Sequence, residues 1–96
     1  MISLQSVILN LQNIKPELAR RFHVQEIGIF GSLTRNDFSD KSDVDIVVSF
    51  NGSIGIEFID LADFIEKSIH HKVDLISRNA MSERFYSAIK NEIQYV

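Results

Sequence analysis

The sequence predicts an α/β (α+β) protein in which helices flank a small mixed sheet, and three observations carry this prediction. Short apolar runs of strand length alternate with longer segments whose apolar residues recur at helical spacing. A chain of 96 residues has room for one domain with a modest core. With 45% apolar residues and no cysteine, that core must be held by packing alone. We therefore expect residues 1–96 to form a single domain.

The N-terminal part is predicted to contain two consecutive helices. Apolar residues from Leu4 to Ile14 follow helical spacing, and Ser3 stands where an N-cap is expected. Pro16 suits the first turn of a second, short helix that extends to Phe22, because its fixed φ and missing N–H cost nothing there. The first strand should follow this second helix.

The middle of the chain predicts two strands joined by a short helix and a polar loop. A short apolar run from Glu26 to Phe30 predicts the first strand. Residues 33–35 are expected to form a short helix, and residues 36–42 are rich in Asn, Asp and Ser, as loops are. The segment from Val44 to Phe50 is almost continuously apolar and β-branched, which is typical of a central strand buried on both faces.

The remaining segments predict a helix, a strand, a second helix and a short edge strand. Residues from Glu57 to Ile69 form an amphipathic pattern with acidic residues at its start, where the helix dipole favours them. Lys72 to Ile76 is the third predicted strand. A last helix is expected from Ala80 to Lys90, and an edge strand from Ile93 to Val96.

The residues with chemical potential lie at the ends of the predicted strands. Gly31 and Ser32 follow the first strand, and Asp43 and Asp45 come ten residues later at the start of the second. A Gly-Ser turn lets backbone N–H groups approach a phosphate, and two acids two positions apart on a strand share one face. Their side chains start about 6.6 Å apart, since a strand rises about 3.3 Å per residue, and can converge on a cation. Asp74 interrupts the third apolar run, where an unpaired buried charge would be costly, so we expect it to be a ligand; a strand face that alternates outward to water is the alternative.

This arrangement predicts a site for a metal-bound nucleotide and also a sheet topology. Carboxylates without sulfur or nitrogen ligands suit Mg²⁺ or Mn²⁺, which also bind substrate phosphates and water. The first and second strands must be antiparallel if Gly31 is to meet Asp45, and the second and third must be parallel if Asp74 is to join them. The helix from Glu57 to Ile69 then serves as the right-handed crossover.

The motif resembles that of the nucleotidyltransferase superfamily that includes DNA polymerase beta. Ile29 to Arg35, Ser42 to Val48 and Lys72 to Ile76 look like the three matching segments of the small stand-alone minimal nucleotidyltransferases, in order and over nearly the whole chain. The resemblance implies that these enzymes' metal-binding and catalytic carboxylates correspond to Asp43, Asp45 and Asp74, and their nucleotide contacts to Gly31, Ser32, Arg35 and Ser42.

The resemblance further implies an antitoxin whose partner is an all-helical toxin of the HEPN class. For some members of the family it implies that AMP passes from Mg²⁺-bound ATP to a hydroxyl of the toxin, with tyrosine as the expected acceptor. The chain is too short to hold an acceptor of its own, so the acceptor is expected on another protein. An antitoxin that neutralises the toxin by stoichiometric binding alone is the alternative, and a metal-dependent phosphohydrolase is a weaker one.

Three positions depart from the family pattern. Thr34 and Asn36 replace the small residue and the glycine that flank the family's arginine, and His70 replaces a glycine before the third strand. Asn tolerates left-handed φ better than most residues, so Asn36 is expected to preserve the turn. None of these changes removes a carboxylate.

Charge and hydropathy exclude other classes of protein. A net charge of −3 argues against direct binding of nucleic acid, which depends on clustered Lys and Arg. No basic segment precedes an apolar stretch at the N-terminus, and no apolar run approaches the ~20 residues that span a bilayer. We therefore expect a cytoplasmic protein.

Overall fold

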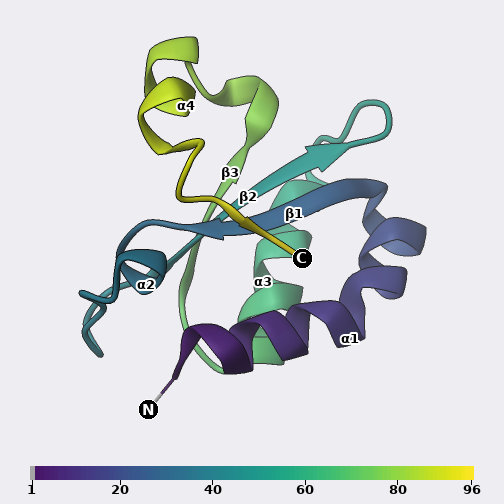
Figure 1. The fold of residues 1–96 in the computed structure, drawn as a ribbon. Helices are drawn as coiled ribbons and strands as arrows, with labels where there is room; N and C mark the ends of the chain where they lie inside the picture. The colour runs from purple at the N-terminus through teal and green to yellow at the C-terminus, as the bar shows by residue number, and fades with distance from the viewer. Residues whose placement is uncertain (1) are drawn as a thin grey trace.

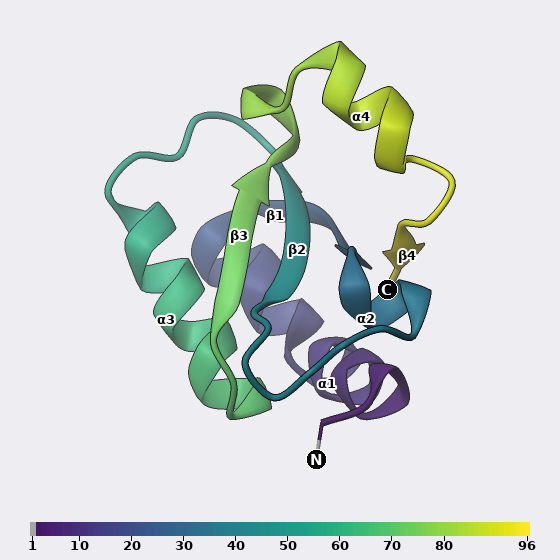
Figure 2. The ribbon, with the colours of Figure 1, turned by 90° about the vertical axis from the view of Figure 1, so that its left-hand side faces the viewer.

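The computed structural model describes residues 2–96, which form a four-stranded sheet in the order β3-β2-β1-β4. β1 is antiparallel to β2 and β4, and β2 is parallel to β3, so the predicted mixed topology is confirmed. Figure 1 shows α1 and α3 below the sheet and α4 above it, and Figure 2 shows β3, β2 and β1 side by side. The strands are β1 (Val24–Phe30), β2 (Val44–Phe50), β3 (Val73–Ser77) and β4 (Gln94–Tyr95).

The N-terminal segment is one helix, α1 (Leu4–Phe22), and the prediction of two helices was wrong. Pro16 lies inside it, where a proline removes a backbone hydrogen bond at a cost of about 3 kcal/mol. The cost is outweighed because the buried face continues through the proline, with Leu11 before it and Leu18 after it both fully buried. Ser3 caps the helix as expected. Neither α1 nor any other helix within residues 2–96 is long and apolar enough to cross a membrane.

The two faces of the sheet are covered unequally. α1 and α3 (Glu57–Ile69) pack on one face and enclose the main core, in which Leu61 and Ile65 are fully buried. On the other face a smaller cluster joins Phe30 and Val47 to Met81 and Ile89. This second face is therefore covered only where the C-terminal part of the chain packs against it.

The last helix, α4 (Glu83–Ile89), is shorter than the predicted segment from Ala80 to Lys90. It follows a 3₁₀ turn, η1 (Arg78–Ala80), and Ser82 starts it by accepting a 3.1 Å hydrogen bond from the Phe85 N–H. Met81 has extended backbone and is buried although it lies outside the helix. The helical spacing of the sequence therefore assigned Met81 to the helix. In the structure this core residue lies before the N-cap, Ser82.

Alternation along β2 assigns the candidate site to the less covered face. Val44, Ile46 and Val48 belong to the main core beneath α1 and α3. Val47 belongs to the smaller cluster on the opposite face, and Asp45, two residues earlier, faces the same way. Any chemistry at Asp45 is therefore performed on the open side of the sheet.

His70 ends α3 in the left-handed conformation, with φ of 58°. A side chain at this position is strained relative to glycine, the residue that adopts left-handed φ most readily. We expect His70→Gly to raise the free energy of unfolding by about 1 kcal/mol, which is about 4–8 °C in Tm for a domain of this size. Thermal unfolding followed by circular dichroism measures the shift. His70→Ala is the matched control, because it keeps the Cβ and should bring no gain; equal Tm values for the two variants would contradict the strain.

Candidate active site

The Gly31 turn and the Asp45 carboxylate are in direct contact. The register of β1 and β2 pairs Phe30 with Asp45, so the chain reaches Gly31 beside the acid. Gly31 has φ of 80°, and a Cβ built on it would lie 2.0 Å from Asp45 Oδ2. Only glycine fits here, both for its φ and for the space that the carboxylate occupies. The phosphate-type turn and the acid predicted from sequence therefore form one site.

Two of the predicted acids, Asp43 and Asp74, lie near the third, Asp45. The parallel register pairs Asp45 directly with Asp74, and Asp43 precedes β2 by one residue. Burial raises the pKa of the Asp45 carboxyl, and the negative charges of Asp74, Asp43 and Glu92 raise it further, against the opposing effect of Arg35. These four charged groups are thus close enough to influence Asp45. The site is a concentration of negative charge with one nearby guanidinium.

Asp74 and Asp43 are exposed, whereas Asp45 is half-buried. Asp74 therefore avoids the cost of burying an unpaired charge that its apolar neighbours in the sequence suggested. β3 is the edge strand of the sheet, so Asp74 stands at an open margin of the site. Asp74 lies beside Asp45 because the parallel register of β2 and β3 pairs the two residues, and not because Asp74 is buried.

The turn after Gly31 keeps its shape with the residues that depart from the family pattern. In α2 (Ser32–Arg35) the Gly31 carbonyl accepts hydrogen bonds from the Thr34 N–H at 3.1 Å and the Thr34 hydroxyl at 2.8 Å. Asn36 ends the helix with φ of 66°, and the Asp37 N–H donates to the Ser32 carbonyl at 3.1 Å. The expectation that Asn36 preserves the turn is confirmed, and the Thr34 hydroxyl adds a bond to it.

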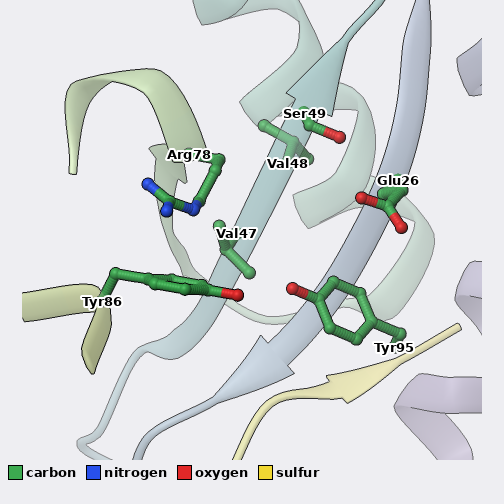
Figure 3. Close-up of a pocket in the computed structure, with 7 residues that line it drawn as sticks. All are labelled: Glu26, Val47, Val48, Ser49, Arg78, Tyr86 and Tyr95. Carbon is green, nitrogen blue, oxygen red and sulfur yellow. The ribbon is translucent and has the colours of Figure 1, made fainter. Parts of the chain in front are cut away.

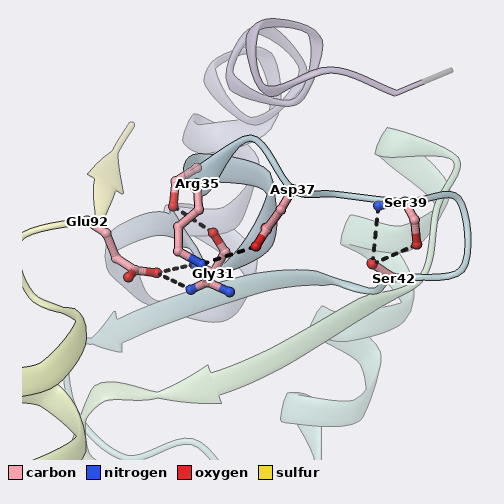
Figure 4. A network of polar contacts seen from close by, with 7 residues as sticks. Gly31, Arg35, Asp37, Ser39, Ser42 and Glu92 are labelled. Atoms are coloured by element: carbon pink, nitrogen blue, oxygen red, sulfur yellow. Dashed lines mark hydrogen bonds and ion pairs between the residues drawn. The ribbon is translucent and has the colours of Figure 1, made fainter.

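Glu92 is a member of this cluster that the sequence did not reveal. Its Oε2 accepts a 2.6 Å hydrogen bond from the Gly31 N–H and a 3.1 Å hydrogen bond from Arg35 Nη1 (Figure 4). Arg35 Nε also lies 3.7 Å from Asp37 Oδ2. A single Glu between α4 and β4 carries no recognisable spacing. Its place in the site follows from the pairing of β4 with β1, which no local pattern specifies.

Ser42 is not brought to the Gly31 end of the site. Its hydroxyl lies 3.1 Å from the Ser39 hydroxyl and accepts a hydrogen bond from the Ser39 N–H at 3.3 Å. Figure 4 shows this pair at the far end of the loop from Gly31 and Arg35. In this arrangement Ser42 closes the loop that leads into Asp43.

The acids suit a cation by their chemistry without forming a closed cage. Within residues 2–96 no three His, Asp or Glu side chains are arranged as a complete set of metal ligands. Mg²⁺ commonly uses only one or two protein carboxylates and completes its shell with water and phosphate oxygens. Asp45 and Asp74, paired in register and mutually repulsive, fit such an open oxygen site. Asp43, exposed and one residue before β2, does not complete the predicted set of three ligands with them in this structure.

A small pocket of about 90 Å³ opens beyond Val47. The Arg78 guanidinium stacks 3.7 Å from the centre of the Tyr86 ring, and the Tyr86 and Tyr95 hydroxyls point toward one another in Figure 3. The buried Ser49 hydroxyl has no hydrogen-bond partner among the described residues. Burial and the adjacent Tyr86 raise the pKa of Tyr95. The pocket is lined by Glu26, Val47, Val48, Ser49, Arg78, Tyr86 and Tyr95.

A mixed sheet that joins a glycine turn to paired aspartates on adjacent parallel strands defines the nucleotidyltransferase class, and comparison with known proteins agrees. Residues 11–96 match the model of the nucleotidyltransferase domain family. The fold superposes on a solved structure described as a minimal nucleotidyltransferase with a TM-score of 0.80, covering 99% of this chain and 95% of the other at 19% identity. The chain belongs to the nucleotidyltransferase domain family and is an enzyme of that class.

Two relatives are more specific in name. The protein adenylyltransferase MntA of Thermococcus cleftensis is 34% identical over 97 residues, which cover 100% of this chain and 98% of that protein. A Methanocaldococcus jannaschii protein, MJ1215, which is assigned by name to the protein adenylyltransferases, is 38% identical over 72 residues, covering 74% of this chain and 84% of its own length. The similarity to the first relative thus extends over the whole of both chains.

Proposed function

We propose that this protein transfers AMP from Mg²⁺-bound ATP, or the Mn²⁺ form, to a hydroxyl of a partner protein. The observation that carries the proposal is the contact of Gly31 with Asp45, because it unites a glycine turn of the kind that binds phosphate with carboxylates able to hold a cation. The names of the two relatives support a protein as the acceptor. ATP is a metabolite of the cytoplasm, so the proposed reaction belongs there.

The roles proposed for the residues follow from their positions. Gly31 and Ser32, with Arg35 beside them, would bind the phosphates of the nucleotide. Asp45 and Asp74, with Asp43 next to them, would hold the cation. A bound Mg²⁺ would offset the repulsion between carboxylates and nucleotide and polarise the phosphate oxygens. Ser42 would support this site through the loop before Asp43.

The proposed step is an in-line displacement at the α-phosphorus. The acceptor oxygen forms a bond to this phosphorus, the bond to the bridging oxygen breaks, and pyrophosphate leaves. Asp74 is exposed on the edge strand, so it can meet an acceptor hydroxyl presented from outside and take up its proton. An acceptor on a second protein fits this open geometry.

The partner that we propose is a HEPN-type toxin, with one of its tyrosines as acceptor and this chain as the antitoxin. Incubation of the protein with its genomic neighbour, Mg²⁺ and ATP labelled at the α-phosphate is expected to transfer label to the partner. Mass spectrometry of the labelled partner then identifies the acceptor residue.

The control uses a double variant, Asp43→Asn with Asp45→Asn, which should form the same complex without transferring label. A stable complex that takes up no label with either Mg²⁺ or Mn²⁺ would reject the transferase proposal. It would favour an antitoxin that acts by stoichiometric binding.

A further inference from the structure

The Glu92 carboxylate occupies the place where the proposed function needs a phosphate oxygen. Its Oε2 accepts hydrogen bonds from the Gly31 N–H at 2.6 Å and from Arg35 Nη1 at 3.1 Å. A phosphate oxygen bound at this turn would use the same two donors, one backbone amide and one guanidinium. The Glu92 side chain is 23% exposed, so this contact is partly shielded from water. The Gly31 N–H carries a single proton, so a phosphate oxygen bound there must displace Glu92 Oε2, which would also repel it.

We propose that Glu92 is an internal competitor for the phosphate-binding position, and that nucleotide binds only when this side chain leaves Gly31 and Arg35. The inference rests on the proposed function, since it assigns the Gly31 turn to nucleotide phosphate. It makes Glu92 a residue that sets nucleotide affinity. The charge of Glu92 also acts on Asp45, so a side chain that stayed in place would repel both the nucleotide and the other acids.

The backbone on either side of Glu92 is anchored, which indicates that the side chain can move without the segment. The Glu92 N–H donates to the Ile89 carbonyl at 2.9 Å, at the end of α4. The next residues pair with β1, where Gln94 faces Ile29, and the Val96 N–H donates to the Ile27 carbonyl at 3.0 Å. Rotation about the side-chain bonds of Glu92 is therefore enough to open the position. Once Glu92 has left, Arg35 keeps the 3.7 Å contact of its Nε with Asp37 Oδ2, and its Nη1 is available to phosphate.

In the closed form Glu92 holds Gly31 and Arg35, and in the open form it has left them. The competition lowers the apparent affinity for phosphate because only the open molecules can bind it. A ligand that binds only the open form has a dissociation constant increased by the reciprocal of the open fraction. If the open form is about one tenth of the molecules, removing the competitor tightens binding about tenfold. Glu92→Gln removes the charge but keeps the size, and Glu92→Ala removes the competing group entirely.

The test measures binding of tripolyphosphate with Mg²⁺ by the nuclear magnetic resonance shift of the Gly31 amide. Tripolyphosphate reports the phosphate position without any contribution from a base or from transfer chemistry. We expect Glu92→Gln and Glu92→Ala to lower its Kd by about three- to tenfold. Glu17→Gln is the control, because it removes the same charge from α1 on the other face of the sheet, and its Kd should equal that of the wild type.

Weaker or unchanged binding in both Glu92 variants would overturn the inference, because Glu92 would then position the turn instead of competing for it. A Gly31 amide that no concentration of tripolyphosphate shifts, in either variant or in the wild type, would also reject it. Failure of the proposed function has a separate signature. In that case the Glu92 variants bind tripolyphosphate more tightly at Gly31, yet no label passes from ATP to the partner.

Discussion

Replacing Asp45 with Asn is expected to abolish AMP transfer and to stabilise the fold at the same time. Loss of a group that merely orients a metal ligand costs about 10- to 100-fold in activity, so loss of a proposed ligand itself should exceed about a hundredfold. The fold gains because burial and the neighbouring acids make the charged form of Asp45 unfavourable. Since the side chain remains partly exposed, we expect a gain on the order of 1 kcal/mol at pH 7.

The stability gain of Asp45→Asn should disappear in acid. The folded protein raises the pKa of Asp45 above the unfolded value, about 3.9 for an ordinary Asp, so protonation stabilises the folded wild type. As pH falls through the folded pKa the wild type recovers this free energy, while the Asn variant has no such group. The difference between the two proteins is therefore largest at neutral pH and lost below about pH 4.

Urea unfolding of both proteins across this pH range measures the difference. Asp63→Asn, on the exposed side of α3, is the control and should shift stability little at any pH. A variant at Asp45 that is less stable than the wild type at pH 7 would show that the carboxylate contributes to the fold. Retained transfer activity would remove Asp45 from the reaction.

Gly31→Ala is expected to have the largest effect on the fold of any single methyl addition near the site. The new Cβ would lie 2.0 Å from Asp45 Oδ2, and the alanine backbone would also have to keep the φ of 80° that glycine has here. The strain of left-handed φ costs about 1–2 kcal/mol, and overpacking adds about 1–3 kcal/mol. We expect a loss of about 2–5 kcal/mol, measured by chemical denaturation, together with loss of AMP transfer because Asp45 must move.

Gly52→Ala separates the two causes. Gly52 has φ of 88°, but a Cβ there would meet nothing within 4 Å. This variant should therefore show the conformational strain alone, about 1–2 kcal/mol, and keep its activity. If both alanine variants lose the same stability, the contact between Gly31 and Asp45 is not as close as the structure places it.

The elements with strong local patterns could be predicted to the residue. β2 spans Val44–Phe50 and α3 spans Glu57–Ile69, as expected, because a continuous β-branched run and a full amphipathic period each favour one structure. The site motif also determined the topology, since Gly31, Asp45 and Asp74 can meet in only one arrangement of strand directions. That prediction depended on the chemistry of these residues, because a phosphate-binding turn and cation-binding carboxylates must lie together to form one site.

Predictions failed where packing outweighs local preference. Pro16 signals a new helix in the sequence, yet the buried face of α1 carries the helix through it. Met81 has the spacing of a helical residue, but Ser82 provides the cap and the helix begins after it. In α1 the continuous buried face decides the outcome, whereas at Met81 the local cap supplied by Ser82 acts together with burial of the side chain.

The sequence by itself determined the class of protein, because glycine at the turn and aspartates at fixed spacing are each required by local geometry and charge. The tertiary structure alone decided two further properties of the site. It exposed Asp74 at the edge strand and brought Glu92 onto Gly31 and Arg35. The physical reason is that Glu92 is placed by the pairing of β4 with β1, a contact across more than sixty residues that no local pattern encodes.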